Sequence, residues 1–261
     1  MRPSRRVDQE GKAPMKRWLL IAGGAFGLVA LLAGGRWWQE QQRVTAAKVE
    51  LQKILAKDGA YMESVLGTEQ NESRLSYKEF FDLCDKAIEG KRTLMVDLRG
   101  AGVGLEPALV ESARAFLEAG NVLIRAKRQI YQEQFELDVA EKSENSKIRQ
   151  LRALHVPNVI DREETIGKMQ ALVVLSRFIV EQLENATQDF AESYRRYAAL
   201  EQTAIQEWQQ RGLNFKGAAE QYQALNMKVV KAVQAKGAAL RTELNNTSAV
   251  LVDAAAQPVS R

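Results

Sequence analysis

The chain has 261 residues, of which 46% are hydrophobic and 27% charged, with only 17 glycines and 5 prolines. This composition favours long helices and excludes turn-rich sandwiches and barrels. The net charge of +4 comes from residues 1–36, which hold seven basic and two acidic residues and so carry +5, whereas the 30 basic and 31 acidic residues of 37–261 carry −1. A nearly neutral large domain argues against a nucleic-acid partner, whereas the basic N-terminus suits a surface of anionic lipid.

The N-terminal region contains an uncharged segment at residues 18–35, preceded by Lys16 and Arg17 and followed by Arg36, Trp37 and Trp38. Its length and its flanking tryptophans predict a transmembrane anchor with membrane lipid as its partner. A cleaved signal peptide is the alternative, but such peptides have a shorter apolar run and a polar cleavage region. Residues 1–17 are then a basic tail.

The distribution of Lys and Arg predicts the topology, because six of them precede the span and four follow it within a comparable distance. This bias places the N-terminus in the cytoplasm and the domain at 36–256 outside it, although it is modest and leaves the opposite topology open. Cys84 is the only cysteine, which excludes an intrachain disulfide and favours a bacterial periplasm over a eukaryotic cell surface. We therefore expect a single-pass protein of the inner membrane, with a disordered tail at 257–261.

Small residues recur along one face of the predicted anchor at steps of four, three and four. Such a face lets a second helix approach closely, so we predict a helix-pairing face, against the alternative that small residues are simply common in membrane helices. The face consists of Gly23, Gly27, Ala30 and Gly34.

The first half of the domain shows three helical patterns. The first continues from the anchor through apolar residues between Val44 and Val65, with only Asp58 off type, and ends at Gly67. Ser76 and Glu79 form a capping box that opens the second, and Pro107 opens the third. The two later apolar stripes comprise Phe80, Cys84, Ala87, Leu94 and Leu98, and then Leu109, Ala113, Phe116, Leu123, Ile130 and Leu137.

The second half contains two more helices after a break at 154–160. The fourth is predicted to open at Asp161 and to end near Gly212, and its residues 171–175 and 178–180 are apolar on nearly all faces, which predicts a place in the middle of the bundle. The last has the most regular spacing, typical of coiled-coil packing, and is a candidate partner-binding stripe. This stripe comprises Tyr222, Leu225, Val229, Val233, Leu240, Leu244 and Leu251. The expected fold is all-α: the anchor and an elongated antiparallel bundle of about five helices.

Several residue groups are candidates for chemical sites. Gly100, Gly102 and Gly104 lack the further glycine of a dinucleotide loop and the lysine of a P-loop. His155 is the only histidine, which excludes a histidine relay, and Cys84 lies on an apolar stripe, where a buried thiol is expected. We expect Tyr194 and Tyr197 to pack inward while the arginines between them face water, and an acidic cluster to form a solvated face. That cluster comprises Glu133, Glu136, Asp138, Glu141 and Glu144.

No catalytic, cofactor-binding or metal-binding residue is therefore predicted. The leading function is a non-enzymatic, membrane-tethered structural or interaction protein that associates with itself or with another membrane protein. The alternative is a periplasmic sensory or small-ligand-binding bundle that acts through a partner membrane protein. An enzyme whose carboxylates meet only in the fold is a third reading.

Overall fold

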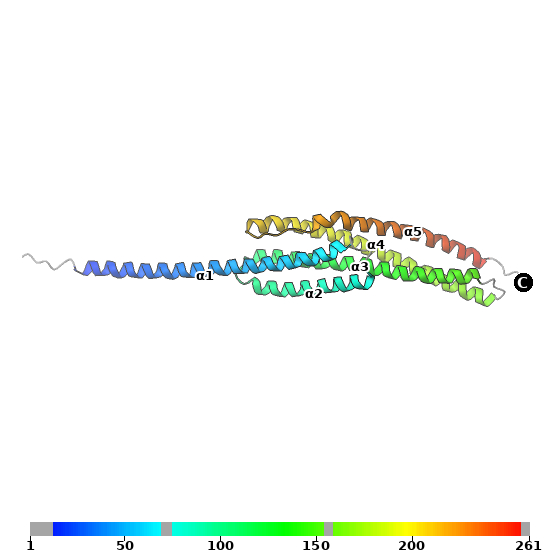
Figure 1. Cartoon of the computed structure of the whole chain (residues 1–261), viewed down its shortest axis with the longest axis horizontal. Helices are drawn as coiled ribbons and strands as arrows, with labels where there is room; N and C mark the ends of the chain where they lie inside the picture. Colours follow the sequence, from blue (N-terminus) through cyan, green and yellow to red (C-terminus); the bar gives the residue numbers. More distant parts are fainter. Residues whose placement is uncertain (1–12, 69–74, 154–158, 257–261) are drawn as a thin grey trace, which may run out of the picture.

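In the computed structural model, the described part of the chain forms five helices. The structure describes residues 13–68, 75–153 and 159–256, and the side chains at 13–34, 141, 143–153, 159–162, 165, 250 and 253–256 lie outside this description. The helices are α1 (Ala13–Leu66), α2 (Tyr77–Ala101), α3 (Pro107–Ala153), α4 (Val159–Gln210) and α5 (Ala219–Ala256). Each runs antiparallel to the one before it, which confirms the predicted antiparallel helical bundle (Figure 1).

Local sequence features set the helix ends. Ser76 accepts a hydrogen bond from the backbone N–H of Glu79, and the Glu79 carboxylate accepts one from the backbone of Ser76, so the capping box is complete. α1 ends directly before Gly67, and α3 begins at Pro107, as predicted. α4 begins two residues before the predicted Asp161, and after its end Gly212 adopts a φ of 77°, which favours glycine.

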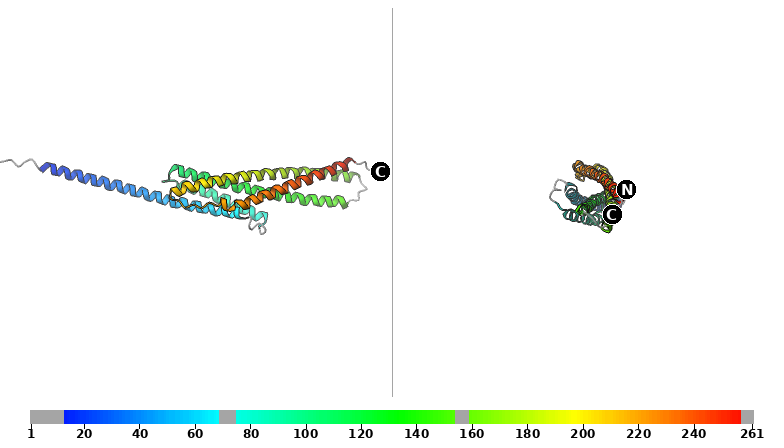
Figure 2. Two further views of the ribbon diagram at one scale, coloured as in Figure 1. Left: turned by 90° about the horizontal axis from the view of Figure 1, so that it is seen from above. Right: turned by 90° about the vertical axis from the view of Figure 1, so that its right-hand side faces the viewer.

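The molecule is elongated, and α1 projects far beyond the other helices at one end (Figures 1 and 2). At that end the turn after α2 and the turn after α4 meet α1. Arg211 joins them, because its Nε lies 3.2 Å from Glu106 and its carbonyl oxygen accepts a hydrogen bond of 2.9 Å from Lys48. We call this the near end of the bundle. The far end holds only α3, α4 and α5.

The core follows the predicted apolar stripes closely. Every residue of the predicted α3 stripe is buried, and so are five aromatic residues of α4 and its following turn: Phe190, Tyr194, Tyr197, Trp208 and Phe215. Phe116 of α3 stacks on Tyr197 with ring centroids 5.1 Å apart and meets Trp208 edge to face at 5.5 Å. Aromatic contacts of this kind hold α3 against α4.

Candidate functional site

The predicted anchor lies within α1, but almost all of it is outside the described side chains. The backbone of residues 18–35 is helical, while Gly23, Gly27, Ala30 and Gly34 belong to the part whose side chains are not described. Among the residues that are described, no helix is long and apolar enough to cross a membrane. The anchor and its pairing face therefore stay predictions.

The part of α1 between this segment and the bundle is a stalk, defined here as residues 35–46. None of its side chains is buried, and Ala47 is the first residue of α1 to enter the core. Trp37 and Trp38 are 66% and 59% exposed. Two indole side chains exposed to water add no stabilisation from apolar burial unless another surface covers them.

The predicted stripe on α5 serves the chain's own core. Tyr222, Val233, Leu244 and Leu251 are buried, and Leu225, Val229 and Leu240 are half-buried. α5 packs along α4, and its first turns meet the end of α1, where the Tyr222 hydroxyl lies 3.3 Å from Glu63. Most of the apolar surface of the stripe is thus used within the chain, and partner binding through these residues stays a prediction.

Sequence reasoning missed an apolar surface on α4. The segment at 171–180 was expected in the middle of the bundle, yet Val174, Leu175 and Phe178 are 65%, 48% and 58% exposed. The reason is that, among the described residues, α4 packs against α3 and α5 alone, which cover one side of it. The exposed residues project on the opposite side and form the α4 outer surface, together with the small, exposed residues Gly167 and Ala171.

A buried ion pair joins α1 to α2. Lys91 donates a hydrogen bond to Asp58, and neither side chain has any exposed area. Burial raises the pKa of Asp58 and lowers the pKa of Lys91, and in each case the partner's charge opposes the shift. Gly120 of α3 makes room for the lysine, since a Cβ there would lie 2.5 Å from its Nζ.

A second buried polar group connects α4 to the start of α5. Glu201 accepts hydrogen bonds of 2.8 Å from the backbone N–H groups of Ala218 and Ala219, and another from the Tyr197 hydroxyl. Burial raises the pKa of Tyr197 well above its usual value, and the negative charges of Asp58 and Glu201 add to this effect. The carboxylate acts as the N-terminal cap of α5.

The C-terminus of α1 is capped from two other helices. Lys127 of α3 donates a hydrogen bond of 2.9 Å to the carbonyl oxygen of Val65, and Asn226 of α5 donates one of 3.3 Å to that of Leu66. A cation at a helix C-terminus is stabilised by the helix dipole. The three buried polar clusters thus fix where α1, α2, α3 and α5 meet.

These clusters suit structural roles, because Asp58, Lys91 and Lys127 are shielded from solvent and a substrate could not reach them without rearrangement of the helices. Within the described part of the chain, no three side chains of His, Cys, Asp or Glu gather as metal ligands. Cys84 is buried as predicted, and burial raises the pKa of its thiol to about 12.

The remaining candidates have mixed outcomes. Tyr194 and Tyr197 are buried while Arg195 and Arg196 are exposed, as predicted. The glycine segment starts as helix, since α2 extends to Ala101. His155, Glu141 and Glu144 lie outside the described side chains.

The expectation of a fully solvated acidic face was wrong. Glu133 of α3 is buried and accepts a hydrogen bond from Gln129 of the same helix, and burial raises its pKa. Asp138 is half-buried and binds Lys236 and Tyr77, whereas Glu136 is exposed.

Comparison of the chain with models of known protein families, with curated proteins and with solved structures finds no match.

Proposed function

We propose that the chain is a single-pass membrane protein without catalytic activity, anchored by residues 18–35 in the inner membrane, with 1–17 in the cytoplasm and the bundle on the periplasmic side. The observation that carries this proposal is the unbroken helix α1, which leaves the bundle as an unburied stalk with two exposed tryptophans. Tryptophans next to a spanning helix lie at the level of the lipid headgroups. The nine residue steps from Trp38 to Ala47 then hold the bundle about 14 Å above the headgroups, at 1.5 Å per residue.

The tether is tested by fractionation and by topology reporters on the full chain. The protein should stay with membranes after alkaline carbonate extraction, and a reporter fused after Arg261 should be active only in the periplasm. A chain released by carbonate, or one whose mature N-terminus lies near Trp37, would contradict the anchor. Reporter activity on the cytoplasmic side would contradict the topology alone.

The bundle's partner surface in this proposal is the α4 outer surface. Exposed apolar side chains that lie together mark interaction sites more often than chance exposure does. We propose a second copy of the chain as the partner, because the surface complements itself. A twofold axis near Leu175 would pair two α4 helices antiparallel and bring Phe178 of one copy over Ala171 of the other, where no large side chain blocks it.

A cysteine cross-link tests this pairing directly. Leu175→Cys should form a disulfide between two copies under mild oxidation, while Gln234→Cys, at an exposed site on α5, should not. The native Cys84 does not interfere because it is buried. A cross-link no stronger than the control, together with a monomer by native mass spectrometry, would refute self-association. A cross-link only to a different membrane protein would replace the second copy by that protein.

A further inference from the structure

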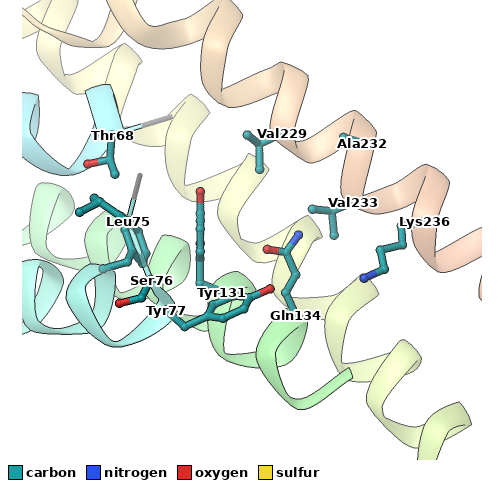
Figure 3. Close-up of a pocket in the computed structure, with 11 residues that line it drawn as sticks. Thr68, Leu75, Ser76, Tyr77, Tyr131, Gln134, Val229, Ala232, Val233 and Lys236 are labelled. Carbon is teal, nitrogen blue, oxygen red and sulfur yellow. The ribbon is translucent and has the colours of Figure 1, made fainter. Parts of the chain in front are cut away.

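A cavity of about 570 Å³ lies where α2, α3 and α5 come together (Figure 3). This volume falls in the range of sites that hold small organic molecules. Its described lining comes from the end of α1, the start of α2, the middle of α3 and one side of α5. The residues are Thr68, Leu75, Ser76, Tyr77, Phe80, Tyr131, Gln134, Val229, Ala232, Val233 and Lys236.

Two facing walls of the cavity are apolar. Phe80 and Tyr131 stack with ring centroids 4.0 Å apart and an interplanar angle of 28°. Val229 and Val233 on α5 form the other wall, as Figure 3 shows. A flat apolar group would contact rings on one side and branched side chains on the other.

The Tyr131 hydroxyl is a polar group without a partner inside this lining. The side chain is only 8% exposed, and its buried oxygen makes no hydrogen bond to any residue that the structure describes. Figure 3 shows the hydroxyl directed toward the space between Thr68 and Val229. A buried hydroxyl without a hydrogen bond is unfavourable, so an acceptor atom placed in the cavity would be stabilised there.

At the rim, Lys236 forms an ion pair with Asp138 and keeps spare donors. Lys236 donates a hydrogen bond of 2.9 Å to Asp138, whose other carboxylate oxygen accepts one of 2.8 Å from Tyr77. Burial alone would raise the pKa of Asp138, but these bonds outweigh it and lower the pKa. The Lys236 side chain is 40% exposed. Its ammonium group makes one contact with Asp138 and keeps further N–H groups that an anion can accept.

We infer that the cavity binds an amphipathic carboxylate. Its apolar body lies between the stacked rings and the α5 valines, and its carboxylate accepts a hydrogen bond from Tyr131 with the charge of Lys236 at the rim. The Tyr131 hydroxyl and the Lys236 ammonium group are donors that favour a carboxylate as the head group, while the hydroxyls of Ser76 and Thr68 are already engaged within the protein and the Gln134 amide offers both a donor and an acceptor. This site depends neither on the membrane anchor nor on the α4 outer surface.

The test uses 2-naphthoate as the probe and the full chain held in amphipol, with fluorescence anisotropy as the readout. Binding should be saturable, and uncharged 2-naphthol should bind about tenfold more weakly, since hydrogen bonds to an ionised acceptor are the stronger ones. Tyr131→Phe, which keeps the stacked ring, should weaken 2-naphthoate binding about fivefold.

Ala232→Trp fills the cavity from an exposed position and should abolish binding. The matched control is Ala239→Trp, which is also exposed and lies two turns further along the same face of α5, outside the lining. Unchanged thermal melting shows that each variant is folded. Absence of saturable binding, or equal affinity in Ala232→Trp and the control, would overturn the site. Equal affinity for 2-naphthol and 2-naphthoate would overturn the carboxylate as its ligand.

Discussion

Replacing Lys91 by methionine isolates the energetic role of the buried ion pair. Methionine keeps the unbranched shape of the side chain but removes the ammonium group, which leaves the Asp58 carboxylate fully buried without its cation. One oxygen of this carboxylate, Oδ2, already lacks a hydrogen-bond partner. Breaking a buried pair from one side costs about 3–5 kcal/mol, so the free energy of unfolding should fall by that amount.

The double variant Asp58→Leu/Lys91→Met separates the cost of an unpaired charge from the worth of the pair. Apolar residues in place of a buried pair are neutral or stabilising by about 1–4 kcal/mol, so the double variant should recover most of the loss. An exposed pair supplies the control, because Lys53 lies 3.0 Å from Glu50 in solvent. Lys53→Met should cost less than about 1 kcal/mol.

The assay is urea unfolding of the full chain, followed by far-ultraviolet circular dichroism. A loss below about 1 kcal/mol in Lys91→Met, equal to that of the exposed control, would refute the unpaired-charge argument. A double variant as unstable as the single one would show that packing, and not charge, causes the loss.

The pH dependence of the difference in unfolding free energy between the wild type and the double variant provides a second check. The pKa of Asp58 is raised on folding, so the folded chain binds more protons than the unfolded one between the ordinary and the raised pKa. The wild type should therefore lose stability relative to the double variant as pH rises through that window. The pKa of Lys91 is lowered, and the wild type should regain relative stability as pH rises from the lowered value toward 10.5.

Three further outcomes are expected. Gly120→Ala should lower the free energy of unfolding by about 1–3 kcal/mol because the new Cβ meets the buried lysine, whereas Gly59→Ala, with no atom within 4 Å, should stabilise slightly; equal effects in urea unfolding would contradict this. Glu201→Gln should weaken the cap of α5, which hydrogen exchange would detect as faster exchange at Ala219 than in wild type; unchanged exchange would remove the capping role. Cys84, whose pKa is about 12, should resist maleimide in the folded chain and react in urea; labelling without denaturant would show that the core opens there.

Helix identity and most helix ends could be predicted because their causes are local. A serine followed three residues later by glutamate, a proline in a first turn and a glycine after a last turn each act within a few residues. The start of α4 was predicted at Asp161, two residues after its observed start at Val159, because more than one polar residue nearby can act as a helix cap.

The sequence shows both charged residues of the buried ion pair at core positions, but only the fold shows that they pair with each other. Asp58 interrupts one apolar stripe, and Lys91 occupies the gap between Ala87 and Leu94 in the next. Two opposite charges at core positions of adjacent helices favour each other as partners. The axial offset between α1 and α2, which brings Asp58 and Lys91 to the same height along the bundle, could not be predicted from the sequence.

The surfaces of α4 and α5 were harder to predict, because periodicity shows that a face is apolar and not what covers it. The regular stripe on α5 resembles a surface for another chain, yet most of it packs within the bundle. Residues 171–180 resemble a fully enclosed helix, yet no third neighbour covers Val174 and Phe178. Which helices extend far enough to cover a given turn depends on the whole assembly.

The continuity of α1 has a mechanical consequence. Because one continuous helix includes both the stalk and the core residues around Asp58, a rotation of α1 near Trp37 is transmitted along the helix to the bundle. Free rotation of the bundle relative to the stalk would require a break in α1, and neither a proline nor a β-turn interrupts residues 35–66. The contacts that hold the N-terminal end of α1 therefore set the direction in which the α4 outer surface faces.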